Sequence, residues 1–307
     1  GDRLFGLVRR RSARFLWLAA LLAMAGPAIA AGPGECGQPG WYRSSPWGFH
    51  TNSFWIAGPR GAVLIDTQFL PSAAREAAAL AAKCARQPVV AALVLHANPD
   101  KFNGTQWLAG EGVEVLSSRA VIEAIPAVDT LRRRWFEERY RPDYPDKLVL
   151  PRSVGDVSTR IERGGVALNL YPLGPSVSVA HVVADWNGHL FVGDLVAHRH
   201  HAWLELGRVD EWIAALEFLR GLRPLRVYPG RGEPGGPELL AAQIDYLRFV
   251  RETVRAAKPR GEPDEATLAA LVRAVVARYP GYGNEYFLEL GIPALWEKLA
   301  ASTADSP

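Results

Sequence analysis

Short apolar runs and longer amphipathic stretches alternate along most of this chain, and they predict strands and helices respectively. Residues 54–57 and 62–66 are apolar runs on either side of the turn residues 58–61, which is typical of a β-hairpin. The alanine-rich stretch 71–83 predicts a helix. Residues 89–95 are continuously apolar, as expected for a strand that is buried on both faces.

The same alternation continues to the C-terminal end. Further strands are predicted at residues 113–116, 166–171, 177–184, 190–192 and 225–228. Helices are predicted at residues 118–125, 128–140, 209–222, 237–257, 265–279 and 293–300, the last three within a C-terminal helical region, 237–302. In each half of the chain, strands that follow one another directly are succeeded by strands that alternate with helices. This order favours an α/β fold of two packed sheets with helices outside.

Composition and charge restrict the function classes. The chain has 307 residues, 49% hydrophobic and 22% charged, which is typical of a globular protein. Its formal net charge is +3, but residues 1–30 hold five arginines and one aspartate, so the remainder carries −1. The overall balance therefore gives no reason to expect a nucleic-acid partner or an anionic membrane surface.

The first 30 residues have the layout of a secretory signal peptide. A basic stretch at 9–14 precedes an apolar run at 15–25, and the small residues Ala28 and Ala30 flank Ile29. The alternative is a membrane anchor, but the run is short for a span and Pro27 interrupts it. We expect cleavage after Ala30, a mature domain over residues 31–307, and a periplasmic or secreted protein.

Two cysteines exclude a cysteine-rich zinc or disulfide framework. Export to an oxidising compartment would allow Cys36 and Cys84 to pair. The alternative is two separate buried thiols, and the sequence does not decide between them because it does not supply the geometry.

The segment His96-Ala97-Asn98-Pro99-Asp100-Lys101 directly follows the buried strand 89–95. With residues 64–68, 173–176, 191–194 and 228–232, it resembles the metallo-β-lactamase superfamily over about residues 50–235. In that family a His-x-His-x-Asp-His loop presents ligands to one or two zinc ions. The resemblance implies a four-layer αββα sandwich, with Asp66 as a structural aspartate that orients the loop.

The family's ligand set is degenerate in this chain. Three of seven ligand positions are retained: His96, Asp100 and Asp194. The other four positions, where the family has histidines, carry Asn98, Lys101, Pro175 and Arg231.

Lys101 and Arg231 are the most informative replacements, because a charged ammonium or guanidinium offers no ligand atom. A divalent ion about 4 Å from one such cation is opposed by roughly 8 kcal/mol at an effective dielectric near 20. We therefore expect these two cations to take the electrostatic role of the metals. They would lie within salt-bridge reach of Asp100 and Asp194 at one end of the sandwich.

Other groups of residues give weaker indications of a metal-binding or catalytic site. His198, His200 and His201 form a short tract that is a weak extra candidate for a relocated metal site, although a polar pocket rim is the favoured interpretation. Gly174-Pro175-Ser176 lacks the Gly-x-Ser-x-Gly frame of a nucleophile elbow. The sequence contains no Walker loop or dinucleotide fingerprint.

Two functions follow. The first is an exported, hydrolase-like protein whose dinuclear zinc site is largely lost and which holds no intact cofactor. Such a protein would be a pseudoenzyme, or it would bind a small anionic ligand or a periplasmic protein partner. Its pocket candidates are Asn98, Asp100, Lys101, Asp194 and Arg231. The alternative is a hydrolase of an ester, thioester, lactone or amide with one zinc ion on His96, Asp100 and Asp194. A third use, docking through the basic helix at 131–140, is less favoured than a solvated charged face.

Overall fold

The computed structural model describes residues 36–304, so the predicted signal peptide, residues 1–30, lies outside the described residues. The described chain divides into two compact units. The N-terminal unit comprises residues 36–174 and 178–193, and the C-terminal unit comprises residues 175–177 and 194–304. The prediction that residues 31–307 form one domain stays a prediction.

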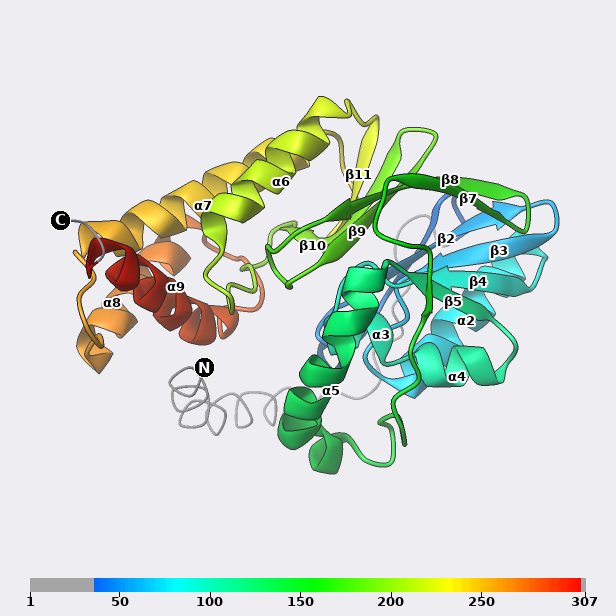
Figure 1. Cartoon of the computed structure of the whole chain (residues 1–307), viewed down its shortest axis with the longest axis horizontal. Helices are drawn as coiled ribbons and strands as arrows, with labels where there is room; N and C mark the ends of the chain where they lie inside the picture. The colour runs from blue at the N-terminus through cyan, green and yellow to red at the C-terminus, as the bar shows by residue number, and fades with distance from the viewer. Residues whose placement is uncertain (1–35, 305–307) are drawn as a thin grey trace. The chain divides into compact units, whose positions relative to one another are not determined.

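A six-stranded sheet lies in the N-terminal unit (Figure 1). Its strands follow chain order: β1 (Gly40–Arg43), β2 (Asn52–Gly58), β3 (Gly61–Ile65), β4 (Val89–Leu93), β5 (Glu114–Ser117) and β6 (Arg152–Ser153). β1 to β3 pair antiparallel, which includes the predicted hairpin, and β3 to β6 pair parallel. A parallel pair needs a crossover, and α2 (Pro71–Ala85) supplies the one between β3 and β4.

The helices of this unit bury small or apolar faces. Ala74, Ala77 and Ala81 on α2 are fully buried at helical spacing, and α2 packs against β2 and β3. The remaining helices are α3 (Pro99–Phe102), α4 (Thr105–Gly110) and α5 (Arg119–Tyr140). The Ser118 side chain caps α5 by accepting a hydrogen bond from the Val121 N–H.

The second sheet has the order β11-β10-β9-β8-β7. Its strands are β7 (Thr159–Arg163), β8 (Val166–Leu173), β9 (His181–Trp186), β10 (His189–Ala197) and β11 (Arg226–Arg231). In the N-terminal unit the two sheets pack face to face, and the rings of Phe54 on β2 and Phe191 on β10 lie 5.7 Å apart. β10 leaves this unit after Gly193 and continues in the C-terminal unit from Asp194.

The C-terminal unit joins the end of β10 and β11 to the helices α6 (Val209–Gly221), α7 (Glu238–Ala256), α8 (Glu265–Arg278) and α9 (Phe287–Ala304). The Trp212 indole on α6 donates a 2.9 Å hydrogen bond to the Leu195 carbonyl, so α6 covers this end of β10. α6 and α7 run side by side (Figure 1). The predicted αββα class, with two sheets and outer helices, is confirmed.

Several predicted boundaries were wrong. Residues 118–125 and 128–140 form one helix, because Pro126 is accommodated inside α5 rather than ending it. The strand predicted from residue 177 begins at His181, since the Ser178 N–H turns back to His181 Nε2. β1, β6 and β7 were not predicted. No helix within residues 36–304 is both long and apolar enough to cross a bilayer.

Cys36 and Cys84 form a disulfide with their Cα atoms 5.0 Å apart. The alternative of two separate thiols is therefore wrong. The bond ties the segment that precedes β1 to the end of α2, across a sequence separation of 48 residues.

Candidate functional site

Asp66 anchors the start of the loop that follows β4 through a side-chain hydrogen bond. This residue has a left-handed backbone, with φ 65°, and it is buried directly after β3. Its Oδ1 accepts a 2.9 Å hydrogen bond from the Leu95 N–H, one residue before His96. Asp66 thus orients the candidate ligand loop, as the family resemblance implies.

A second set of contacts fixes α3. Thr67 directs both its N–H and its hydroxyl to the Lys101 carbonyl, at 3.0 and 2.7 Å. A Cβ on Gly104 would lie 2.0 Å from the Thr67 carbonyl oxygen, so this close approach requires glycine. The loop that carries the predicted site residues is therefore rigidly positioned.

Lys101 and Asp100 form a buried ion pair. Lys101 Nζ lies 3.2 Å from Asp100 Oδ2, and the exposed fractions of the two side chains are 0% and 8%. The Thr51 hydroxyl, which the sequence analysis missed, lies 3.0 Å from the same carboxylate oxygen. Burial makes such a pair electrostatically strong and makes the loss of either partner costly.

His96 and Asn98 meet at Ser178. Ser178 Oγ lies 2.9 Å from His96 Nδ1 and 3.0 Å from Asn98 Oδ1. The Ser178 N–H donates to His181 Nε2 at 3.1 Å, and the rings of His96 and His181 lie 4.9 Å apart. These side chains are at most 9% exposed, so they form a compact polar cluster inside the N-terminal unit.

The other edge of the His96 ring lies against the backbone of β10. Gly193 has φ 55°, and a Cβ there would lie 2.9 Å from His96 Cδ2 and 3.1 Å from His96 Nε2. The imidazole is therefore confined between Ser178 on one side and Gly193 on the other.

Asp194 and Arg231 form the second buried ion pair, within the C-terminal unit. Arg231 Nη1 lies 2.6 Å from Asp194 Oδ2, and the side chains are 5% and 4% exposed. The guanidinium carbon also lies 5.3 Å from the centre of the Phe287 ring, within cation–π distance. Like Lys101 and Asp100, these two residues join a buried cation to a buried carboxylate.

The three histidines of the tract point to different partners. His198 Nδ1 lies 2.7 Å from the Glu233 carbonyl, and His200 Nδ1 lies 2.9 Å from the His198 carbonyl. His201 is fully buried, and its Nδ1 lies 2.8 Å from the Tyr246 hydroxyl. Burial, with a smaller contribution from the charge of His200, lowers the pKa of His201 to about 4.

The predicted site residues thus fall into two groups. The N-terminal unit brings together His96, Asn98, Asp100 and Lys101, and the C-terminal unit brings together Asp194 and Arg231. Pro175 also belongs to the C-terminal unit. The prediction that both ion pairs form one network stays a prediction.

The donor set does not fit the family's dinuclear zinc centre. Asp100 and Asp194 are each already paired with a buried cation that offers no ligand atom. Within residues 36–304, no three His, Cys, Asp or Glu side chains are grouped so that they could hold a metal ion.

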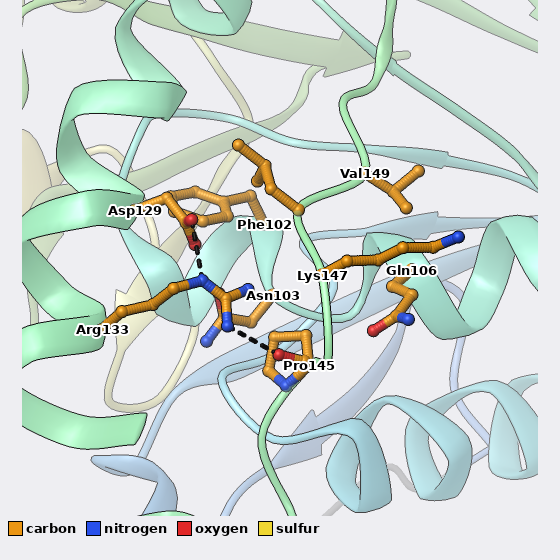
Figure 2. A pocket seen from close by; sticks show the side chains of 9 residues that line it. Phe102, Asn103, Gln106, Asp129, Arg133, Pro145, Lys147 and Val149 are labelled. Atoms are coloured by element: carbon orange, nitrogen blue, oxygen red, sulfur yellow. Dashed lines mark hydrogen bonds and ion pairs between the residues drawn. The ribbon is translucent and has the colours of Figure 1, made fainter. Parts of the chain in front are cut away.

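A small cleft lies beside α5, and Phe102 and Asn103 are among the residues that line it (Figure 2). Arg133 lines it, with Nε 2.8 Å from Asp129 Oδ2 and Nη1 2.8 Å from the Pro145 carbonyl. Lys147 also lines the cleft. These bonds fix the position of the Arg133 guanidinium at the wall of the cleft.

Solved structures that are similar to this chain include the following two. A metallo-β-lactamase from Pontibacter korlensis is 25% identical, with 64% of this chain and 87% of that chain covered and a TM-score of 0.49. The stereoselective inverting sec-alkylsulfatase Pisa1 from a Pseudomonas species is 17% identical, with 87% of this chain covered and a TM-score of 0.63. The matched region spans only 51% of the sulfatase chain, and this likeness shows the fold alone.

The sequence itself matches a family. Residues 46–231 match the pattern described as the metallo-beta-lactamase superfamily, and this range includes both sheets from β2 to β11. The match covers more than half of the chain. The protein therefore belongs to the metallo-β-lactamase superfamily.

Proposed function

We propose that this protein is an exported, hydrolase-like member of its superfamily that works without a dinuclear zinc centre. The observation that carries the proposal is the fully buried Lys101 ammonium, 3.2 Å from Asp100, at a position where the family has a histidine ligand. The pair of Arg231 and Asp194 supports it independently, at 2.6 Å.

Electrostatics gives the physical reason. Each zinc ion carries two positive charges, and a fixed cation about 4 Å away opposes it by roughly 8 kcal/mol at an effective dielectric near 20. The carboxylates that would offset this repulsion are already neutralised by Lys101 and Arg231. The two cations therefore stabilise the same carboxylates that the metals stabilise in zinc-dependent relatives.

A single metal ion on His96, Asp100 and Asp194 is the competing function. The pairing of Asp100 with Lys101 and of Asp194 with Arg231 argues against it, because both carboxylates already hold a buried cation. The spread of His198, His200 and His201 over three different partners argues against an extra contribution from the tract.

The ligand we propose is a small molecule or a periplasmic protein. The expectation that this ligand is anionic stays a prediction. Export is supported by the disulfide between Cys36 and Cys84, because such bonds persist mainly in oxidising compartments.

Metal analysis and hydrolysis assays test the proposal. The purified protein, incubated with zinc and then dialysed, is expected to retain no zinc and to hydrolyse β-lactams and thioesters at the background rate. One bound zinc ion per chain with ester or thioester hydrolysis would favour the single-metal function. Two bound zinc ions per chain would overturn the proposal.

A further inference from the structure

The end of α6 and the turn that joins it to β11 expose large apolar side chains in the C-terminal unit (Figure 1). Phe218 on α6 is 46% exposed, and Leu225 in the turn is 69% exposed. Ala214 and Leu222 lie four residues before and after Phe218, so they share its side of the helix. Ala214 is exposed and Leu222 is half-buried. These four residues, which we call the apolar stripe, run along the outside of α6 into the turn.

Four exposed arginines accompany the apolar stripe, namely Arg220, Arg223, Arg226 and Arg248. Arg248 on α7 belongs to this group through Glu217, whose carboxylate lies 4.0 Å from Arg248 Nη2 and 3.2 Å from Arg220 Nη1. Residues 217–226 and Arg248 together hold these four arginines and one glutamate, which gives a local charge of +3.

The arginines are not neutralised within the described part of the chain. Arg223 forms no ion pair with any described residue. Glu238 on α7 interacts with Arg226, but only as a minor influence on the pKa of that glutamate. Glu217 is shared between two of the cations. The surface around the apolar stripe therefore attracts anions.

Apolar side chains edged by basic ones match the boundary between headgroups and acyl chains of an anionic bilayer. The apolar groups enter this boundary, and the cations meet the lipid phosphates. We propose that this face docks the protein on membranes that contain anionic phospholipids, with Phe218 and Leu225 inserted at the level of the headgroups. A purely anionic soluble partner would match the arginines but would leave the apolar stripe in water.

The local charge excess is hidden in the charge of the whole chain. Residues 31–307 carry −1 overall, which by itself gives no reason to expect a membrane surface. Docking of this kind is peripheral and needs no membrane-spanning helix, because only a few side chains enter the headgroup region. The inference goes beyond the proposed function and does not depend on whether zinc is bound.

A fluorescent label in the turn measures the contact. Both cysteines of the sequence are held in the disulfide, so Leu225→Cys supplies one reactive thiol for an environment-sensitive fluorophore. The full chain is mixed with vesicles of equal parts phosphatidylcholine and phosphatidylglycerol that carry bromine on their acyl chains. We expect a blue-shifted emission that the bromine quenches.

Val157→Cys is the matched control, because Val157 is 72% exposed but lies in the N-terminal unit. Its label should be neither shifted nor quenched. Any contribution of residues 1–30 to vesicle binding is shared by the two labelled proteins, so a difference between the labels reports on the turn itself. Vesicles of phosphatidylcholine alone should leave both labels unchanged.

The charge is tested separately. Arg223→Gln should lower the affinity for the anionic vesicles by about fivefold, as expected for the loss of one basic side chain at such a surface. Arg160→Gln is the control, since Arg160 is an exposed arginine on β7, and it should bind like the parent. Circular dichroism checks that all variants are folded.

Three results would overturn the inference. The first is the absence of quenching at residue 225, or equal quenching at residue 157. The second is equal binding to vesicles with and without phosphatidylglycerol. The third is retention of the protein on immobilised heparin without quenching at residue 225, which would indicate a site for soluble polyanions instead.

Discussion

The buried ion pair of Lys101 and Asp100 gives the sharpest stability prediction. Lys101→Met keeps most of the apolar stem and removes only the charge, which leaves Asp100 without this cation. Both side chains are almost fully buried, at 0% and 8% exposure, so solvent does not replace the lost partner. Breaking such a pair typically costs about 3–5 kcal/mol. We expect a decrease of this size in the free energy of unfolding.

Urea unfolding in the presence of a chelator measures the change. The matched control is Arg60→Met, because Arg60 and Glu162 lie 3.4 Å apart but are 67% and 58% exposed. An exposed pair contributes about 0–1 kcal/mol, so this control should hardly change stability. The double variant Lys101→Met with Asp100→Asn should be more stable than Lys101→Met alone, because it also removes the buried carboxylate charge. A decrease for Lys101→Met no larger than that for Arg60→Met would refute the argument.

Three further predictions concern other parts of the chain. Reduction of the disulfide, or Cys84→Ser, should lower stability by about 2–4 kcal/mol through the freed 48-residue loop, as thermal unfolding with and without reductant will show. Burial lowers the pKa of His201 from an ordinary 6.5 to about 4, so the folded state favours the neutral imidazole. The free energy of unfolding should therefore be independent of this group above pH 6.5 and should fall by about 3 kcal/mol as the pH drops to 4. His201→Gln should flatten that pH dependence in urea titrations, and an unchanged slope would contradict the assignment. Gly104→Ala should prevent stable folding, because its Cβ would lie 2.0 Å from the Thr67 carbonyl oxygen, and a native circular dichroism spectrum with an unchanged melting temperature would contradict this.

The sequence predicts those parts of the site that are local in the chain. Lys101 and Asp100 are neighbours in one motif, so their contact follows from the position of that motif after a buried strand. Asp66 could be assigned a supporting role for the same reason. Arg231 and Asp194 are 37 residues apart, and only the order of family landmarks indicated that they belong to the site.

The residues that were missed depend on contacts between distant segments. Ser178 lies 82 residues from His96 and Thr51 lies 49 residues from Asp100, and neither position carries a motif of its own. The sequence signal nearest to Ser178 is the landmark at residues 173–176, which lacks the family's histidine. Helix boundaries failed at Pro126 because tertiary packing overrides the local preference against an internal proline.

Zinc titration calorimetry tests the central claim most directly, namely that Lys101 and Arg231 take the electrostatic role of the metals. The parent protein is compared with the double variant Lys101→His with Arg231→His, which returns two imidazoles at positions where the family has them. We expect no measurable zinc binding by the parent and clear binding by the double variant. Stoichiometric zinc binding by the parent, or binding by the double variant that is equal or weaker, would contradict it.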